Sequence, residues 1–451
     1  MAMGRRRRAV QGEFWVAVDE LPPAPAHPFY VQINKLLDGG GFDGFVEERC
    51  RQFYAEVMGR PSLPPAIYFR LLLVGYFEGI DSERGIAWRL ADSLGLRQFV
   101  GYQVTDNTPD HSVLSRTRRL IDLETHQEVF TWTLGVLAQA GLLKSRTIGI
   151  DATTLEANAA MRSIVRRDSG EGYQEFLTRL AAESGIETPT REELVKLDKT
   201  RKNKASNDDW QSPSDPDAKI AKMKDGRTHL AHKAEHAVDM ESGAIVAVTL
   251  QPADRGDTTS IGETLEQAAE NIVSVVASGA EVSAAALTEI VADKGYHSNA
   301  ALVEHSHLRT YISEPDRGPR NWVGKRAERD AVYANRRRIR GARGRRLMRR
   351  RGELIERSFA HCYDTGGMRR THLRGRDNIL KRALVHVAGF NLSLVMRKLL
   401  GAGTPRGWTG LAARIWSRLC DHPVWWSFIA ALRELYAAVT PRMMCGLRAA
   451  A

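Results

Sequence analysis

The sequence predicts two structural parts, an N-terminal all-α bundle and a larger domain of α+β or α/β class in which helices flank a mixed sheet. Residues 27–144 contain only helical patterns, whereas β-type segments begin after Lys144 and two alternating strands follow at 229–254. The chain has 451 residues, 43% of them hydrophobic, which is enough for two or three domains with sizeable cores.

The positive charge of the chain is concentrated in one stretch. The formal net charge is +11 and the pI about 9.6. Fifteen Arg or Lys residues and only two acids lie between Arg317 and Arg351, so the rest of the chain is nearly neutral. Planar guanidinium groups suit phosphate oxygens. The stretch therefore favours nucleic-acid binding over a merely solvated surface.

The composition argues against several classes of protein. No stretch approaches the roughly 18–20 uninterrupted apolar residues that span a bilayer, and no apolar signal-peptide core follows the basic residues 1–8. The four cysteines lie far apart without a CxxC pair, which argues against a zinc site or a disulfide framework. We therefore expect a cytoplasmic, nucleoid-associated protein that does not bind membranes.

The N-terminal part is expected to comprise a flexible basic arm at 1–26 and a helical DNA-binding bundle at 27–144. Residues 64–80 are apolar on all sides, as in a buried helix, and Asp81 and Ser82 can cap the helix that follows. Residues 108–143 open with Thr-Pro-Asp, a favourable helix start. Basic residues of this last segment either contact DNA phosphates or form the solvated face of a capped helix.

The larger domain is expected at 145–400. It begins with an Ile- and Thr-rich strand at 146–159, followed by a charged insertion at about 159–228 that is part helix and part flexible loop. Residues 229–254 predict a hairpin that turns at Met-Glu-Ser-Gly, and 257–277 an amphipathic helix.

Two further strands and two helices complete the predicted domain. The strands are "LTEIVADKGY" and residues 309–315, and the helices are 352–370, stopped by a Gly-Gly pair, and 377–401. The order is strand, insertion, hairpin, helix, strand, strand, helix, helix, which is the order of an RNase H-like fold. We expect residues 401–451 to form a helical C-terminal tail of unknown role.

Three acids stand at distinct places in this order: Asp151 in the first strand, Asp293 at the end of a later one and Glu356 on a helix. Two divalent ions about 4 Å apart can activate the nucleophile and stabilise the leaving oxygen in phosphodiester chemistry. Mg²⁺ prefers carboxylate oxygens. The three acids are therefore predicted to be catalytic and to bind two Mg²⁺ ions, for which Mn²⁺ can substitute. Gly295 is expected to let the backbone turn away after Asp293.

Each acid also has a simpler explanation. Asp151 could pair with an arginine and Asp293 could cap its strand, while Glu353, one turn before Glu356, competes with it on the same helical face. Asp257 is expected to be a turn or cap residue. Three histidines lack the spacing of metal motifs and are expected to be hydrogen-bonded within the protein: His232, His236 and His297.

The chain resembles a DDE transposase of a bacterial insertion sequence, of the class with an InsH-like N-terminal region. The resemblance covers roughly residues 27–400. It rests on "LLLVGYFEGIDSERGIAWRLADSLGL", "TPDHSVLSRTR", "GIDATTLEANA", "DPDAK", "HKAEHAVDMESGAIVAVTLQPADRGDTTS", "VADKGYHS" and "GELIERSFAHCYDTGGMRRTHLRGRDNILKR".

The resemblance implies metal-dependent cleavage of double-stranded DNA at the element ends and transfer of the freed 3′-hydroxyl to target DNA. It also implies a homodimer or higher oligomer on DNA. Asp151, Asp293 and Glu356 correspond to the metal-binding triad. Many relatives in the wider group carry a lysine seven residues after the glutamate, where this chain has Tyr363.

Since that lysine is absent, Arg369 or Arg370 is expected to supply the charge. The residues expected to contact DNA are all arginines: Arg116, Arg119, Arg336, Arg337, Arg338, Arg340, Arg345, Arg346, Arg349, Arg350, Arg351, Arg357, Arg369 and Arg370.

Two other functions compete with transposition. An RNase H-fold structure-specific nuclease would hydrolyse DNA without joining it, and a DNA-binding regulator derived from a transposase would have a decayed site. The complete acid triad argues against decay.

Overall fold

The structure is a computed structural model that describes residues 26–55, 62–201, 206–223, 226–279, 282, 287–316, 318 and 320–410. The expected basic arm, apart from its last residue, and the expected tail beyond Gly410 lie outside the described residues.

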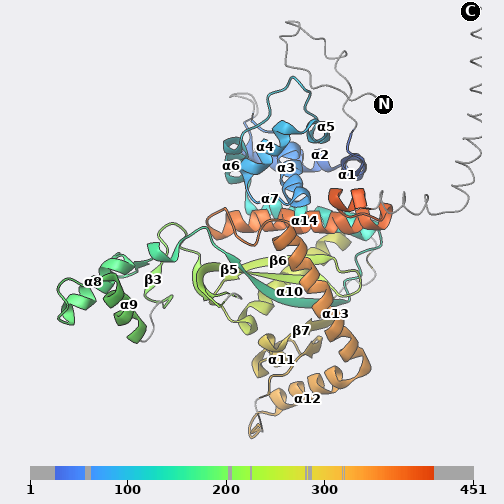
Figure 1. The fold of residues 1–451 in the computed structure, drawn as a ribbon. Helices are drawn as coiled ribbons and strands as arrows, with labels where there is room; N and C mark the ends of the chain where they lie inside the picture. The colour runs from blue at the N-terminus through green and yellow to red at the C-terminus, as the bar shows by residue number, and fades with distance from the viewer. Residues whose placement is uncertain are drawn as a thin grey trace, which may run out of the picture.

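The N-terminal region is all-helical, as predicted (Figure 1, blue). Its helices are α1 (Pro28–Gly39), α2 (Phe42–Cys50), α3 (Pro65–Glu78), α4 (Glu83–Asp92), α5 (Leu94–Val100), α6 (His111–Leu120) and α7 (Leu123–Gln139). The predicted segment 108–143 forms two helices because Asp122 caps a new one, its carboxylate accepting the Thr125 N–H at 2.8 Å. Helix α3 is buried nearly all round, as its apolar sequence predicts.

A six-stranded mixed sheet forms the centre of the second region. Its strands are β1 (Thr147–Glu156), β4 (Lys219–Lys222), β5 (Thr228–Asp239), β6 (Ile245–Pro252), β7 (Glu289–Ala292) and β8 (Arg309–Ile312). β5 pairs with β4, β6 and β1, all antiparallel, and β1, β7 and β8 are parallel neighbours. The order β6-β5-β1-β7-β8 and these directions are those of an RNase H-like fold, which confirms the predicted fold class.

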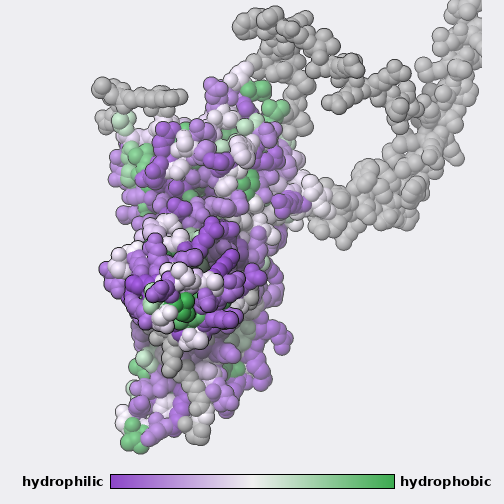
Figure 2. Space-filling view, turned by 60° about the vertical axis from the view of Figure 1, so that its left-hand side comes forward, coloured by the Kyte–Doolittle hydropathy of each residue, from purple (hydrophilic) through white to green (hydrophobic). Residues whose placement is uncertain are grey.

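The segment between β1 and β5 projects from the sheet (Figure 1, green). It contains β2 (Val165–Arg166), α8 (Tyr173–Glu183), α9 (Arg191–Thr200) and β3 (Trp210–Gln211). Figure 2, in which this segment comes forward, shows a mainly hydrophilic surface. Only helix and loop are predicted here, but β4 also lies in this segment and extends the main sheet, because it pairs with the first residues of β5.

Helices α10 (Asp257–Ala277) and α13 (Ala342–Phe359) pack on opposite faces of the sheet. Strand residues alternate in direction. Ala152 and its partner Glu235 therefore face α10, whereas Asp151 and its partner His236 face α13. On the α13 face, a Cβ at Gly149 would lie 2.4 Å from the Met240 sulfur, so this position has no room for a side chain.

The arginine-rich stretch is helical. It forms α12 (Arg326–Arg340) and the first half of α13, which meet at a corner at the lower end of the molecule in Figure 1, beside α11 (Asn299–Glu304). The predicted helix 352–370 thus begins ten residues earlier, at Ala342, and continues after Phe359 as a π-helical turn, Ala360–Thr365, that ends before Gly366. Arginine favours helix, and the buried Val332 and Leu347 anchor the two helices.

Helix α14 (Arg376–Leu400) joins the two regions (Figure 1). It packs against α3 and α7 on one side and β6 on the other. The helical stretch 376–410 is the one candidate for a membrane span within the described residues, and 89% of its apolar window is buried inside the protein. α14 is therefore the core helix of the molecule.

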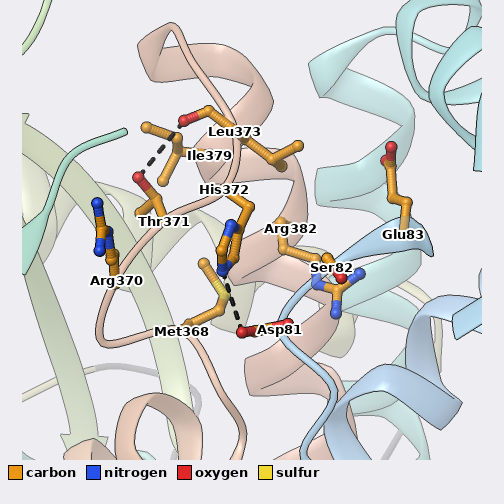
Figure 3. Close-up of a pocket in the computed structure, with 10 residues that line it drawn as sticks. All are labelled: Asp81, Ser82, Glu83, Met368, Arg370, Thr371, His372, Leu373, Ile379 and Arg382. Carbon is orange, nitrogen blue, oxygen red and sulfur yellow. Dashed lines mark hydrogen bonds and ion pairs between the residues drawn. The ribbon is translucent and has the colours of Figure 1, made fainter. Parts of the chain in front are cut away.

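Polar contacts secure the same junction. Lys381 on α14 donates to the Arg118 and Ile121 carbonyls at 3.2 and 2.8 Å. Figure 3 shows His372 approaching Asp81, with Nε2 3.0 Å from the carboxylate, across a cavity of about 20 Å³. A cavity of this volume holds about one water molecule, so it belongs to the junction and is too small for a substrate.

Burial holds two hydrogen-bonded histidines, His126 and His236, neutral. His126 lies with Nδ1 2.7 Å from the Asp122 carbonyl, which can only accept, and Nε2 3.0 Å from the Tyr68 hydroxyl. Nδ1 therefore carries the proton. Burial lowers the pKa of His126 and of His236 to about 3.

These lowered pKa values predict loss of stability in mild acid. Unfolded histidine titrates near 6.5, so between about pH 6.5 and 3 the unfolded chain binds more protons than the folded one. Each histidine should lower the free energy of unfolding by about 2 kcal/mol at pH 5, relative to neutral pH. The midpoint of thermal unfolding should fall between pH 7 and pH 5, and fall less in His126→Asn, whose amide can still donate to Asp122. Equal falls in both proteins would contradict this role.

Candidate active site

Asp151 and Asp293 lie side by side on two parallel strands. β1 pairs with β7 so that Ile150 lies opposite Ala292, and the next residue in the chain is an aspartate in each case: Asp151 within β1 and Asp293 directly after the end of β7. Asp293 also caps the turn that follows β7, where the Gly295 N–H donates to its Oδ1 at 2.7 Å. The cap and the site are therefore compatible roles of one side chain.

One guanidinium group lies between the two aspartates. Nη2 of Arg351, on α13, is 2.5 Å from Oδ2 of Asp151 and 4.0 Å from Oδ2 of Asp293. Oδ1 of Asp151 accepts the Ala152 N–H at 2.9 Å. The sequence places Arg351 among the residues that contact DNA, whereas in the structure it contacts the acidic site.

Glu356 belongs to the same electrostatic cluster. Burial raises the pKa of Asp151 to about 6, Arg351 opposes this rise, and the carboxylates of Asp293 and Glu356 add to it. Glu353, the competing glutamate, is 64% exposed and pairs with Arg357 on its own helix. The structure therefore favours Glu356 as the third acid.

The donor atoms suit a hard divalent ion. Oδ2 of Asp151 and Oδ2 of Asp293 converge on one point, the position of Arg351 Nη2, and carboxylate oxygens are the ligands that Mg²⁺ prefers. Within the described residues, no three acidic, histidine or cysteine side chains lie close enough to enclose an ion as they stand. The oxygens of the two aspartates thus fit a shared ion, and Glu356 adds a third negative charge to the cluster.

His236 fixes the helical turn that follows Glu356 against the sheet. Ser358 donates its hydroxyl to the Ile355 carbonyl, so its oxygen accepts from His236 Nδ1 at 2.9 Å. The Tyr363 hydroxyl then donates to Nε2 at 2.6 Å. Tyr363 is fully buried, so the residue that replaces the expected lysine has an internal role. His232 is likewise hydrogen-bonded, as predicted.

A buried polar network that was not predicted from the sequence holds the turn after Asp293. The Tyr296 hydroxyl donates to Glu235 at 2.7 Å, and the hydroxyls of Ser260 and Thr264 donate to the same carboxylate. Glu235 is completely buried on β5. The available signal was an acid in the middle of a long predicted hairpin strand, because a charge that becomes buried there needs partners.

Asp257 lies against the same turn. Its Oδ1 accepts from Lys233 Nζ at 2.6 Å, and the N-cap of α10 is Gly256, so Asp257 is not the expected cap. A Cβ at Gly295 would lie 2.5 Å from Asp257 Oδ2. Glycine therefore permits this close approach, since a larger residue would make the Asp257 carboxylate shift, and because Gly295 does not have a positive φ the backbone turn expected from the sequence does not itself require glycine.

The predicted DNA-contacting arginines fall into two groups. Five are exposed on α12 and α13, and their side chains make no hydrogen bond or ion pair within the described chain: Arg337, Arg340, Arg345, Arg346 and Arg349. Others bind protein groups: Arg336 binds Glu314, Arg338 binds Thr310, Arg350 the Glu241 carbonyl and Arg357 Glu353. Arg116 and Arg119 are exposed on α6 and reach back to Ser112 and Ser115.

Arg369 and Arg370 lie along β1. Arg369 Nη1 donates to the Thr153 hydroxyl at 2.8 Å, and Arg370 Nε is 3.6 Å from Glu156. Thr153 is two residues beyond Asp151 and so lies on the same face of the strand. The structure thus places Arg369 nearer than Arg370 to the acidic cluster along this strand.

Comparison with known protein families gives two matches. Residues 17–120 match the family described as "Transposase domain (DUF772)", and residues 162–392 match the "Transposase DDE domain". The second match contains Asp293 and Glu356, whereas Asp151 precedes its first residue. Searches among curated proteins and solved structures found no match. Because the second match covers more than half of the chain, in agreement with the RNase H-like sheet, the chain belongs to the transposases with a DDE catalytic domain.

Proposed function

We propose that the protein cleaves DNA at the ends of its insertion sequence and joins the freed 3′-hydroxyl to target DNA by transesterification. The observation that carries the proposal is the convergence of Asp151 and Asp293 on adjacent parallel strands, with Glu356 close enough to raise the pKa of Asp151. Acids fixed on strands and a helix hold their geometry better than acids on loops.

Asp151 and Asp293 would hold two Mg²⁺ ions, with Glu356 completing one site, and Mn²⁺ can substitute. When bound, such ions neutralise charge on the phosphate and make water or a 3′-hydroxyl a better nucleophile. The chain itself contributes positioning, because β1 and β7 fix the two aspartates and His236 fixes the helix of the glutamate.

The exposed arginines of α13 supply a path for double-stranded DNA to the acids. Arg345 and Arg349 are one turn apart, and Glu356 follows two turns after Arg349 on the same side of the helix. The backbone phosphates are the natural partners of such a row. The helical region 27–144, with Arg116 and Arg119, is proposed as a second DNA-binding surface. Assembly as a homodimer or higher oligomer belongs to the same proposal.

Removing any one acid should abolish both chemical steps. Asp151→Asn, Asp293→Asn and Glu356→Gln keep the shape of each side chain but remove a charge needed for the ions, so double variants should lose no more activity than single ones. Strand cleavage and strand transfer are measured on labelled linear DNA with Mg²⁺ or Mn²⁺, and DNA binding should persist in every variant.

Glu353→Gln is the matched control, because Glu353 lies one turn away and is largely exposed. It should retain most activity. An inactive Glu353→Gln with an active Glu356→Gln would reverse the assignment. Hydrolysis by the wild type without any joined product would indicate a nuclease of the same fold.

Removing the unpaired arginines of α13 should weaken DNA binding and its salt dependence. Replacing Arg345, Arg346 and Arg349 with alanine should lower the slope of log K against log salt by about 0.9 for each phosphate that the variant no longer neutralises. Binding measured by fluorescence anisotropy at several salt concentrations gives this slope.

A control variant removes the same charge elsewhere. Arg162, Arg191 and Lys196 are exposed on the projecting segment between β1 and β5, and their replacement by alanine should leave the slope nearly unchanged. Equal slopes in the two triple variants would show that net charge, and not the α13 row, determines binding.

A further inference from the structure

We propose that Arg351 makes metal loading depend on DNA: in the free protein its guanidinium neutralises Asp151 and Asp293, and it moves to a DNA phosphate when ions bind. This inference rests on the proposed function, because it assumes that the two aspartates bind metal. It gives Arg351 a role in metal binding, whereas the other arginines are proposed only to bind DNA.

The contacts of the two aspartates define which oxygen atoms are open to an ion. Each Oδ1 accepts a backbone N–H, from Ala152 in one case and Gly295 in the other. Each Oδ2 faces the same atom, Arg351 Nη2. The two oxygens that accept no backbone N–H, and so are the most open to an ion, are therefore the two that face Arg351.

Arg351 and a divalent ion cannot share this position. Mg²⁺ binds oxygen at about 2.0–2.1 Å, and Nη2 lies 2.5 Å from Oδ2 of Asp151. Two cations at such a separation repel strongly in a partly buried site. An ion that takes this oxygen must displace the guanidinium, and the displacement lowers the metal affinity of the free protein.

The guanidinium of Arg351 is held loosely enough at the aspartates to be displaced. Its side chain is 12% exposed, yet Nε and Nη2 make no hydrogen bond of good geometry, so charge alone holds the group. Arg336, by contrast, donates two hydrogen bonds to Glu314. A displaced guanidinium needs a new anion, and a phosphate of DNA bound at the acidic site supplies it.

The consequence is positive coupling between DNA and metal. DNA favours the displaced arginine, and so do the ions, so each should tighten binding of the other by the same factor. Couplings of this kind are roughly 5- to 150-fold. DNA phosphates can also contact an ion directly, so the part due to Arg351 is the difference between the wild type and a variant that lacks the guanidinium.

The test measures Mn²⁺ binding to the full-length protein by electron paramagnetic resonance of the free ion. The measurement is made with and without a DNA duplex of about 30 base pairs, roughly three helical turns. Without DNA, Arg351→Ala should bind Mn²⁺ at least about fivefold more tightly than the wild type. The increase in affinity on adding the duplex should be smaller in the variant by the same factor. If the alanine variant does not fold, Arg351→Gln replaces it, and this variant should show the same tighter binding of Mn²⁺ and the same smaller effect of the duplex.

Two controls separate the possible failures. Arg349→Ala removes an exposed arginine two residues away and should bind Mn²⁺ like the wild type without DNA. Asp151→Asn should bind Mn²⁺ weakly, and if it binds like the wild type the metal site of the proposed function is wrong. If Asp151→Asn loses Mn²⁺ but Arg351→Ala and Arg351→Gln bind no more tightly than the wild type, the role of Arg351 alone is overturned.

Discussion

The parallel pairing of β1 with β7 is the constraint on which the candidate site depends. It places Ile150 opposite Ala292, so that the aspartates that follow each residue emerge side by side. A shift of one residue in either strand would turn one carboxylate to the other face of the sheet. The buried residues Ile148, Ile150, Ile290 and Val291 help fix the register, because both faces of the sheet are packed here and the same slip would exchange their packing partners.

The two faces of the sheet contribute different residues to the surroundings of this pair. On one face, α13 brings Arg351 and Glu356 to the aspartates and is held by the bonds from His236 to Ser358 and Tyr363. On the other, the buried Glu235 accepts three hydroxyls and anchors the turn after Asp293. The acids thus stand on a framework in which His236 and Glu235 are both hydrogen-bonded, and such pairing limits side-chain movement.

Helix α14 connects that framework to the helical N-terminal region. It is buried between β6 and helices α3 and α7, and Lys381 closes the junction with two backbone carbonyls. Because the two regions share a core helix, the exposed arginines of α6 keep a defined position relative to the acids. DNA that contacts both regions would therefore meet the site in one orientation.

The sequence by itself determined the class of fold and the chain order of its main elements, and it singled out Asp151 and Asp293 as candidate acids, because periodicity and chain order are local properties that survive without packing. It also located the arginine-rich stretch, but not the helices that this stretch forms. Only a few apolar residues, such as the buried Val332 and Leu347, lie among the arginines, so no helical hydrophobic pattern was visible. Only the tertiary structure gave a reason to favour Glu356 over Glu353, and it revealed Glu235, Tyr296 and the position of Arg351. Those depend on contacts between residues 61 to 200 positions apart in the chain, which no local pattern records.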